Sequence, residues 1–172
     1  MEEKKFTIQF IITGGTIDSH YDGSKDTAVP NKESVIPSFI QSLRLHNDTD
    51  FAVVCMKDSR DLNEEDLKNL LSAVEKSAYE KIVITHGTYT IAESARFLKA
   101  NLKRKDQTII FTASAIPLSG FAPSDGPFSL GYAVAKNLIP LKKESVLKAI
   151  EQIVPEKYRE LNINAFNLGY AS

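Results

Sequence analysis

The sequence predicts a three-layer αβα fold, with helices on both faces of a mostly parallel β-sheet. Short apolar runs rich in β-branched and aromatic residues alternate with segments of helix length. The 172 residues are 42% hydrophobic, which is enough for one sizeable core. No internal repeat, low-complexity tract or Gly/Ser linker marks a boundary, so we expect residues 1–172 to form a single domain.

The strands of this sheet are expected at four apolar runs. They are Phe6–Ile12, Phe51–Met56, Lys81–Thr85 and Thr108–Thr112. Their spacing is typical of a parallel sheet, because parallel neighbours need a crossover connection that is usually a helix. The segment Asp18–Asn31 is polar and has no period, so we expect a mobile loop after the first strand, where loops often act as lids.

Four amphipathic segments predict the helices. Two of them are expected over Ser34–Leu45 and Lys143–Val154. Asn63 can cap a third helix, whose first turn is acidic. Thr90 with Glu93 three residues later fits a capping box at the start of a fourth. The tail Asn162–Ser172 is ambiguous, and an edge strand is one interpretation of it.

Composition favours a small ligand over nucleic acid or a membrane surface. The 21 Lys and Arg residues balance 22 Asp and Glu residues, so a net charge of -1 creates no global field. Cys55 is the only cysteine, so no intrachain disulfide can form, and its apolar neighbours favour a buried thiol. The amino terminus lacks the apolar core of a signal peptide. We therefore expect a cytoplasmic protein with no nucleic-acid or membrane partner.

The chemistry is expected where the strands end, because the carboxyl ends of parallel strands share one edge of the sheet. Four loops leave the strands there, Thr13–Asp18, Asp58–Asp61, His86–Thr90 and Ala113–Pro117. Gly14 and Gly15 let the backbone turn sharply and present Thr16 as a nucleophile or anion-binding hydroxyl. Taken alone, this pattern fits a simple tight turn equally well, and Thr88 fits hydrogen bonding at a helix start.

Four motifs in these loops together resemble the bacterial-type L-asparaginases. Thr13-Gly14-Gly15-Thr16-Ile17 resembles the family's first threonine motif, and Ile84-Thr85-His86-Gly87-Thr88-Tyr89-Thr90 resembles the second. Asp58-Ser59-Arg60-Asp61-Leu62-Asn63 is similar to its substrate-serine segment, and Ser124–Leu130 is similar to its "ADGPFNL" stretch. Order and approximate spacing agree across roughly residues 6 to 135, so the resemblance implies a domain like the asparaginase amino-terminal domain.

The resemblance implies an amide hydrolase that releases ammonia from a small carboxamide, so the expected partner is a small-molecule amide or carboxylate. Thr16 would attack the carboxamide to form an acyl-enzyme, which water would then hydrolyse. Thr88 would assist from the opposite side of the site, and Tyr21 would serve as a lid tyrosine. Ser59 would hold the substrate's α-carboxylate. The other predicted substrate-binding residues are Gly15, Asp58, Gly87 and Tyr89.

One departure from the family pattern concerns the substrate. The family usually has His-Gly-Thr-Asp-Thr, with an aspartate that helps to bind the α-ammonium group, whereas this sequence has Tyr89. A charge-assisted hydrogen bond of about 1.5–3 kcal/mol is therefore lost. Free asparagine is a doubtful substrate, and Tyr89 at this edge is suited to stack on a ligand without an ammonium group.

Two further departures concern catalysis and assembly. The family's catalytic lysine has no counterpart, because Lys136, Lys142 and Lys143 have the pattern of solvated helix-end charges. Removing a positioned proton-transfer group lowers the rate by about 10²- to 10⁴-fold. The chain also ends where the family continues into a smaller domain that completes the neighbour's site in oligomers. We expect a more open site and consider a homodimer reasonable.

Two other functions stay open. A catalytically degenerate domain would keep the pocket between Thr16, Ser59 and Thr88 and bind a small carboxylate or amide. A flavodoxin-like protein would use the Gly-Gly-Thr turn to cradle the phosphate of FMN, although the other three motifs then have no explanation. His86 has the context of an orienting or buried residue. No metal-ligand spacing is present, and we expect neither a metal nor a cofactor.

Overall fold

Four parallel strands form the central sheet of the computed structural model, which describes residues 6–120, 125, 132, 142–154 and 156–171. The strand order is β4-β1-β5-β6. The strands are β1 (Thr7–Gly14), β4 (Asp48–Lys57), β5 (Lys81–Thr85) and β6 (Thr108–Thr112). All four predicted strands are confirmed, with β4 starting at Asp48 instead of Phe51.

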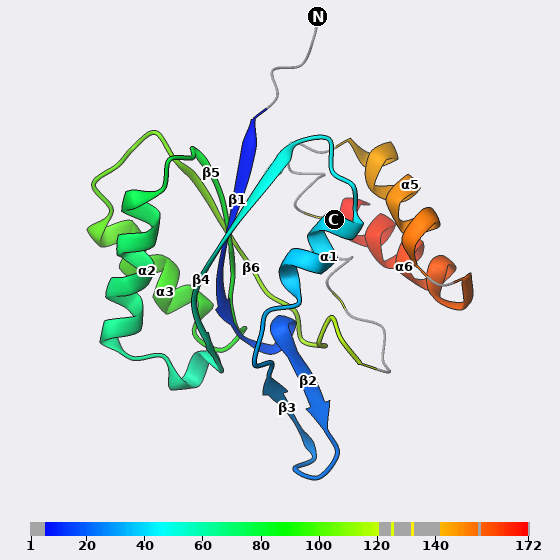
Figure 1. Ribbon diagram of the computed structural model, residues 1–172, viewed down its shortest axis with the longest axis horizontal. Coiled ribbons are helices and arrows are strands. Elements are labelled where there is room, and N and C mark those ends of the chain that lie inside the picture. Colours follow the sequence, from blue (N-terminus) through cyan, green and yellow to red (C-terminus); the bar gives the residue numbers. More distant parts are fainter. Residues whose placement is uncertain (1–5, 121–124, 126–131, 133–141, 155, 172) are drawn as a thin grey trace, which may run out of the picture.

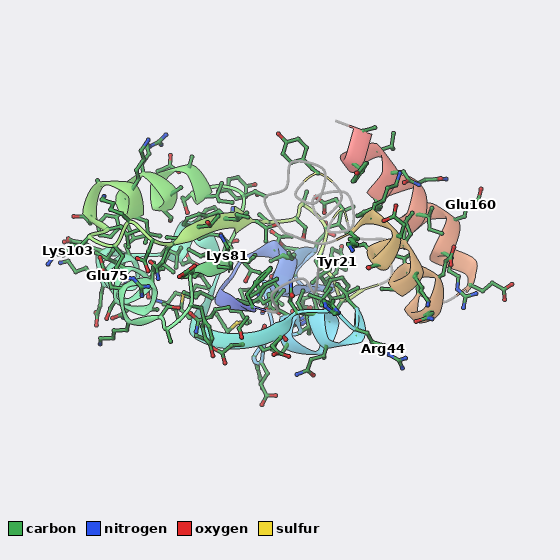
Figure 2. All side chains as sticks on the ribbon, turned by 90° about the horizontal axis from the view of Figure 1, so that it is seen from above. Tyr21, Arg44, Glu75, Lys81, Lys103 and Glu160 are labelled. Carbon is green, nitrogen blue, oxygen red and sulfur yellow. The ribbon has the colours of Figure 1, made fainter. Side chains whose placement is uncertain are left out.

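Helices cover both faces of this sheet, which confirms the predicted three-layer αβα architecture (Figure 1). Helices α2 (Glu64–Lys76) and α3 (Ile91–Asn101) lie on one side. On the other side lie α1 (Ile36–Ser42), α5 (Lys143–Ile153) and α6 (Glu156–Ala171). Figure 2 shows the same arrangement from above, with Glu75 and Lys103 at the α2 and α3 end of the molecule and Glu160 at the α6 end.

The side chains of β1 join the three layers, because alternate residues of a strand point to opposite faces. Ile8, Phe10 and Ile12 are buried in a cluster with α1 and α5. Ile11 lies in a second cluster, with α2 and α3, and is 0% exposed. A continuous apolar run in β1 is therefore required by burial on both faces.

The segment expected to be a mobile loop is instead mostly a β-hairpin, so that prediction was wrong. Strands β2 (Ser19–Asp22) and β3 (Thr27–Pro30) pair antiparallel. The turn between them is ordered by Asp22, whose carboxylate accepts hydrogen bonds from the backbone N and the Oγ of Ser24 at 3.0 and 2.6 Å. Such short polar strands carry too little hydrophobic alternation to be recognised in the sequence.

The carboxyl-terminal tail forms helix α6, so an edge strand is the wrong interpretation. Phe166 of α6 is 0% exposed and packs against Val146 and Ile150 of α5. The apolar spacing of Ile163 and Phe166 is therefore that of a helix face, not of a strand.

Helix α1 is shorter than predicted and is followed by Arg44, whose positive φ of 47° is incompatible with a continuing helix.

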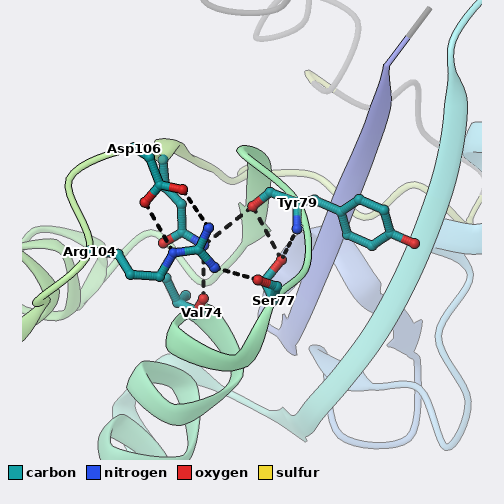
Figure 3. Close-up of polar contacts among 6 residues, drawn as sticks. Val74, Ser77, Tyr79, Arg104 and Asp106 are labelled. Carbon is teal, nitrogen blue, oxygen red and sulfur yellow. Dashed lines mark hydrogen bonds and ion pairs between the residues drawn. The ribbon is translucent and has the colours of Figure 1, made fainter.

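Polar side chains join the layers at the edge of the sheet opposite the strands' carboxyl ends (Figure 3). Gln107 Nε2 donates to the carbonyls of Val74 and Tyr79 at 2.9 and 3.3 Å. Arg104 donates to the Ser77 carbonyl and pairs with Asp106. These bonds add side-chain donors to carbonyl groups at and just after the end of α2, where the Val74 carbonyl also accepts the backbone N–H of Ser77.

Phe166→Ala tests whether α6 is an integral part of the fold. Removing a fully buried aromatic ring leaves a cavity, and we expect the free energy of unfolding to fall by about 3–5 kcal/mol in urea titration. Leu168→Ala on the same helix is the matched control, because Leu168 is 64% exposed. Equal effects of the two substitutions would show that α6 does not pack as described.

Candidate functional site

The loops that follow β1, β4 and β5 touch one another with almost no space between their backbones. A Cβ atom on Gly15 would lie 2.4 Å from the backbone N of Gly87. A Cβ atom on Gly87 would lie 2.4 Å from Ser59 Oγ. This contact lies at the carboxyl ends of β1 and β5, where the connection from β1 runs to β4 on one side and the connection from β5 runs to β6 on the other side. Open α/β sheets bind their ligands at such a switch point.

The loop after β6 joins the same cluster. The backbone N of Leu118 donates to the Ile17 carbonyl at 3.2 Å, and Ser119 Oγ donates to the Ser19 carbonyl at 2.9 Å. Asp125 orders this loop by accepting the backbone N–H groups of Ala115 and Ile116. All four loops therefore converge, as the strand pattern predicted. Except for Asp125, the "ADGPFNL"-like stretch Ser124–Leu130 and also Lys136 lie outside the described residues.

Thr16 lies at the start of a short 3-10 helix, η1 (Thr16–Asp18), immediately after the two glycines. Gly14 and Gly15 have φ angles of 88° and 78°, and Gly15 has ψ of 179°, a conformation almost restricted to glycine. The Thr16 side chain is half-buried and makes no hydrogen bond with the part of the chain that the structure describes. Its hydroxyl is therefore available to a ligand.

Asp18 fixes the turn that carries Thr16, which the sequence pattern did not indicate. Its side chain is 0% exposed and accepts hydrogen bonds from the backbone N of Val35 at 2.8 Å and from Ser34 Oγ. Asn31, directly after β3, donates to the same carboxylate through Nδ2 at 3.4 Å, and its backbone N donates to the Asp18 carbonyl at 3.1 Å. One buried carboxylate thus joins η1 to the start of α1 and to the hairpin.

Ser59 begins a second 3-10 helix, η2 (Ser59–Asp61), and is 3% exposed. Its Oγ is buried and has no hydrogen-bond partner among the described residues. The Ser59 carbonyl accepts a hydrogen bond from Thr90 Oγ1 at 2.8 Å. The predicted capping box at Thr90 was therefore wrong, because its hydroxyl bonds across the site to Ser59 and not to its own helix. The cap at Asn63 is confirmed.

The predicted residues Thr88 and Tyr21 lie in more exposed places. Thr88 is exposed in the loop after β5. Tyr21 is 44% exposed on β2, and its hydroxyl donates to Asp26, which raises the pKa of the phenol. The hairpin that carries Tyr21 projects from the edge of the sheet where the loops meet (Figure 1).

Asp58, Arg60 and Tyr89 form a contact between two of the loops, and Arg60 was not among the predicted site residues. Asp58 accepts hydrogen bonds from the Arg60 backbone N, Nε and Nη2 at 2.9, 3.0 and 2.8 Å. These bonds hold the pKa of Asp58 below its usual value. The Arg60 guanidinium also lies 4.7 Å from the ring centroid of Tyr89, a cation–π distance. The Asp-x-Arg spacing is the only sequence signal for this contact.

His86 is fully buried, as expected for an orienting residue. Its Nδ1 lies 2.9 Å from the Gly87 carbonyl oxygen, and its Nε2 is buried without a partner among the described residues. Burial lowers the pKa of His86 because it disfavours the imidazolium form. Cys55, expected to be buried, is only half-buried, and desolvation raises the pKa of its thiol to about 11, which disfavours the thiolate at neutral pH.

The described ranges contain neither a group of metal ligands nor a membrane-spanning helix. Among these residues, no three His, Cys, Asp or Glu side chains are grouped so that they could hold a metal ion. None of the helices described here has the length and hydropathy to cross a bilayer.

Known proteins share this fold. The model of the family "Asparaginase, N-terminal" matches residues 7–155. The probable cytoplasmic L-asparaginase from Campylobacter jejuni is 27% identical, with a TM-score of 0.61, over 82% of this chain and 41% of that one. The thermostable L-asparaginase from Thermococcus kodakarensis shares the fold at 22% identity, with a TM-score of 0.58, over 75% of this chain and 40% of that one. The chain thus spans about two fifths of the length of each.

Gly15→Ala tests whether the contact between the loops is needed for folding. The backbone conformation alone costs a non-glycine residue about 1–3 kcal/mol, and the clash with the Gly87 backbone adds to this. We expect a clear fall in the urea midpoint. Gly23→Ala in the hairpin turn is the control, since its Cβ would meet only Tyr21 at 3.9 Å. An unchanged midpoint for Gly15→Ala would contradict the close contact.

Proposed function

Because the chain belongs to the asparaginase family, by its match over residues 7–155, we propose that it is an amidohydrolase that releases ammonia from a small carboxamide. Thr16 is the proposed nucleophile, with Thr88 and Tyr21 as the other catalytic residues. The proposed substrate-binding residues are Gly15, Asp58, Ser59, Gly87 and Tyr89. A homodimer remains a prediction.

In the proposed reaction, Thr16 Oγ forms a bond with the carboxamide carbon while its proton is transferred towards the amide nitrogen. The C–N bond breaks and ammonia leaves, which produces an ester with Thr16. Water then attacks this ester, releases the carboxylate product and returns a proton to the threonine. A threonine hydroxyl needs help to lose its proton, and the oxyanion needs hydrogen-bond donors. Thr88, exposed after β5, is the proposed donor on the opposite side.

The observation that carries the proposal is the Ser59 hydroxyl. A buried hydroxyl without a partner is unfavourable, because it has lost its hydrogen bonds to water. Ser59 Oγ is in this state, and it lies against Gly87 in the cluster that also contains Gly15. A substrate carboxylate oxygen would supply the missing acceptor. This supports a pocket for a carboxylate-bearing amide beside Thr16.

We do not assign the proton transfer to a lysine. Lys143 lies with Nζ 4.6 Å from the ring centroid of Tyr170, on helices α5 and α6, which supports the prediction that it serves as a helix-end charge. Without a positioned proton-transfer group we expect turnover to be about 10²- to 10⁴-fold slower than with one. The first alternative, a binding domain without turnover, uses the same pocket. A flavin-binding protein leaves three of the four motifs unexplained.

Thr16→Ala tests the nucleophile. We expect the variant to lose ammonia release from a panel of asparagine, glutamine, succinamate and nicotinamide, because no acyl-enzyme can form. Ligand binding, followed by calorimetry with succinate, should be largely retained. Thr108→Ala is the control, since Thr108 is an exposed hydroxyl where β6 begins, at the opposite edge of the sheet. Ammonia release retained in Thr16→Ala would refute the assignment.

Ser59→Ala separates binding from folding. Because the hydroxyl has no partner in the described part of the chain, its removal should leave the melting temperature unchanged or slightly raised. Loss of one hydrogen bond to a charged carboxylate should weaken succinate binding by roughly ten- to a hundredfold. Thermal melting measures the change in stability, and calorimetry measures the change in affinity for succinate. A lower melting temperature with unchanged affinity would favour a purely structural role.

A further inference from the structure

We propose that Arg60 is a specificity-determining residue, which restricts the site to carboxamides that carry no ammonium group. The inference rests on the proposed hydrolase function and names the substrate class of the same site. It depends on the contacts of one guanidinium group with Asp58 and Tyr89, which belong to two different loops.

The first contact occupies the carboxylate nearest to Ser59. Both oxygens of Asp58 accept hydrogen bonds from the Arg60 side chain, at 3.0 Å from Nε and 2.8 Å from Nη2. An ammonium group is bound in proteins chiefly by carboxylates, through charge-assisted hydrogen bonds. Asp58 is charged, since its pKa is lowered by these bonds, but its charge is already paired. A substrate ammonium would have to displace Arg60.

The second contact occupies an aromatic face. Aromatic rings attract cations through their π-electrons, and an exposed tyrosine at the edge of a site is suited to bind an ammonium group. Tyr89 is 69% exposed, but the Arg60 guanidinium lies 4.7 Å from its ring centroid. The same cation therefore covers both the Asp58 carboxylate and a face of Tyr89. It would also repel a second positive charge placed beside it.

The position of this contact makes it relevant to the substrate. Arg60 directly follows Ser59, whose buried Oγ lies against Gly87, and Tyr89 is two residues beyond Gly87. The contact between Arg60 and Tyr89 therefore connects the loop after β4 with the loop after β5, which together form the proposed pocket. The hydrogen bonds and the charge of Asp58 raise the pKa of Arg60, and Asp61, the other acid of this turn, adds to this effect. The substrate class that fits is a carboxamide with a carboxylate but no neighbouring ammonium group.

Succinamate and L-asparagine distinguish this class, because they differ only in the ammonium group. For the unmodified protein we expect kcat/KM from ammonia release to favour succinamate by at least about tenfold. Arg60→Gln frees the Asp58 carboxylate and should shift the ratio towards asparagine by about tenfold. In Arg60→Gln combined with Asp58→Asn this gain should disappear, because no carboxylate remains to bind ammonium.

Arg104→Gln is the matched control. Arg104 also pairs with an aspartate two residues away, Asp106, but at the opposite edge of the sheet (Figure 3). Its loss should leave the substrate ratio unchanged. Circular dichroism and thermal melting establish that each variant is folded. Equal or better use of asparagine by the unmodified protein, or an unchanged ratio in folded Arg60→Gln, would overturn the inference.

The binding of the two products tests the inference separately from hydrolysis. If no amide is hydrolysed, the proposed function fails, and calorimetry with succinate and L-aspartate still measures the selectivity. Tighter binding of succinate, with the difference reduced in Arg60→Gln, supports the role of Arg60. Equal affinities, tighter binding of aspartate, or no binding of either acid would overturn it.

Discussion

The contact between the backbones after β1 and β5 is the constraint on which the site depends. A Cβ atom on Gly15 would meet the backbone of Gly87, and a Cβ atom on Gly87 would meet Ser59 in the loop after β4, so neither position has room for one. The absence of side chains at Gly15 and Gly87 allows this approach, which links the turn that carries Thr16 to Ser59 through Gly87, although Thr16 and Ser59 belong to different crossover connections. The parallel pairing of β1 with β5 fixes the register of the approach, with Ile12 opposite Thr85. The geometry of the sheet backbone thus determines which residues lie at the carboxyl ends of the strands.

Buried polar groups around this contact differ in how they are satisfied. Asp18 has several donors, and it joins η1, α1 and the hairpin into one rigid support. Ser59 Oγ and His86 Nε2 have none within the described residues. Satisfied buried groups rigidify a structure, whereas unsatisfied ones are unfavourable unless a ligand or water completes them. Asp18 is thus part of the support of the site, and of the two unsatisfied groups only the Ser59 hydroxyl is proposed to contact the substrate.

The sequence predicted the features that depend on local pattern. The strands, the cap at Asn63 and the convergence of four loops follow from apolar runs and from parallel topology. The hairpin, helix α6 and the bond from Thr90 to Ser59 did not follow, for different physical reasons. Short strands lack periodicity, a tail helix is defined by the face it buries against α5, and a hydroxyl chooses its partner only in the folded chain. The roles proposed for the site residues rest on the family and await the experiments.

The central position of β1 also determines how the protein assembles during synthesis. Its neighbour β4 follows within about fifty residues of chain, but its other neighbour, β5, begins only at Lys81. Until then one edge of β1 has no partner, and apolar residues such as Ile11 lack half of their cover. Non-local pairing of this kind is intrinsically slow and exposes intermediates to aggregation. The contact of Gly87 with Gly15 and Ser59 therefore forms only after β5 has been made, and a nascent chain that ends before residue 87 lacks it.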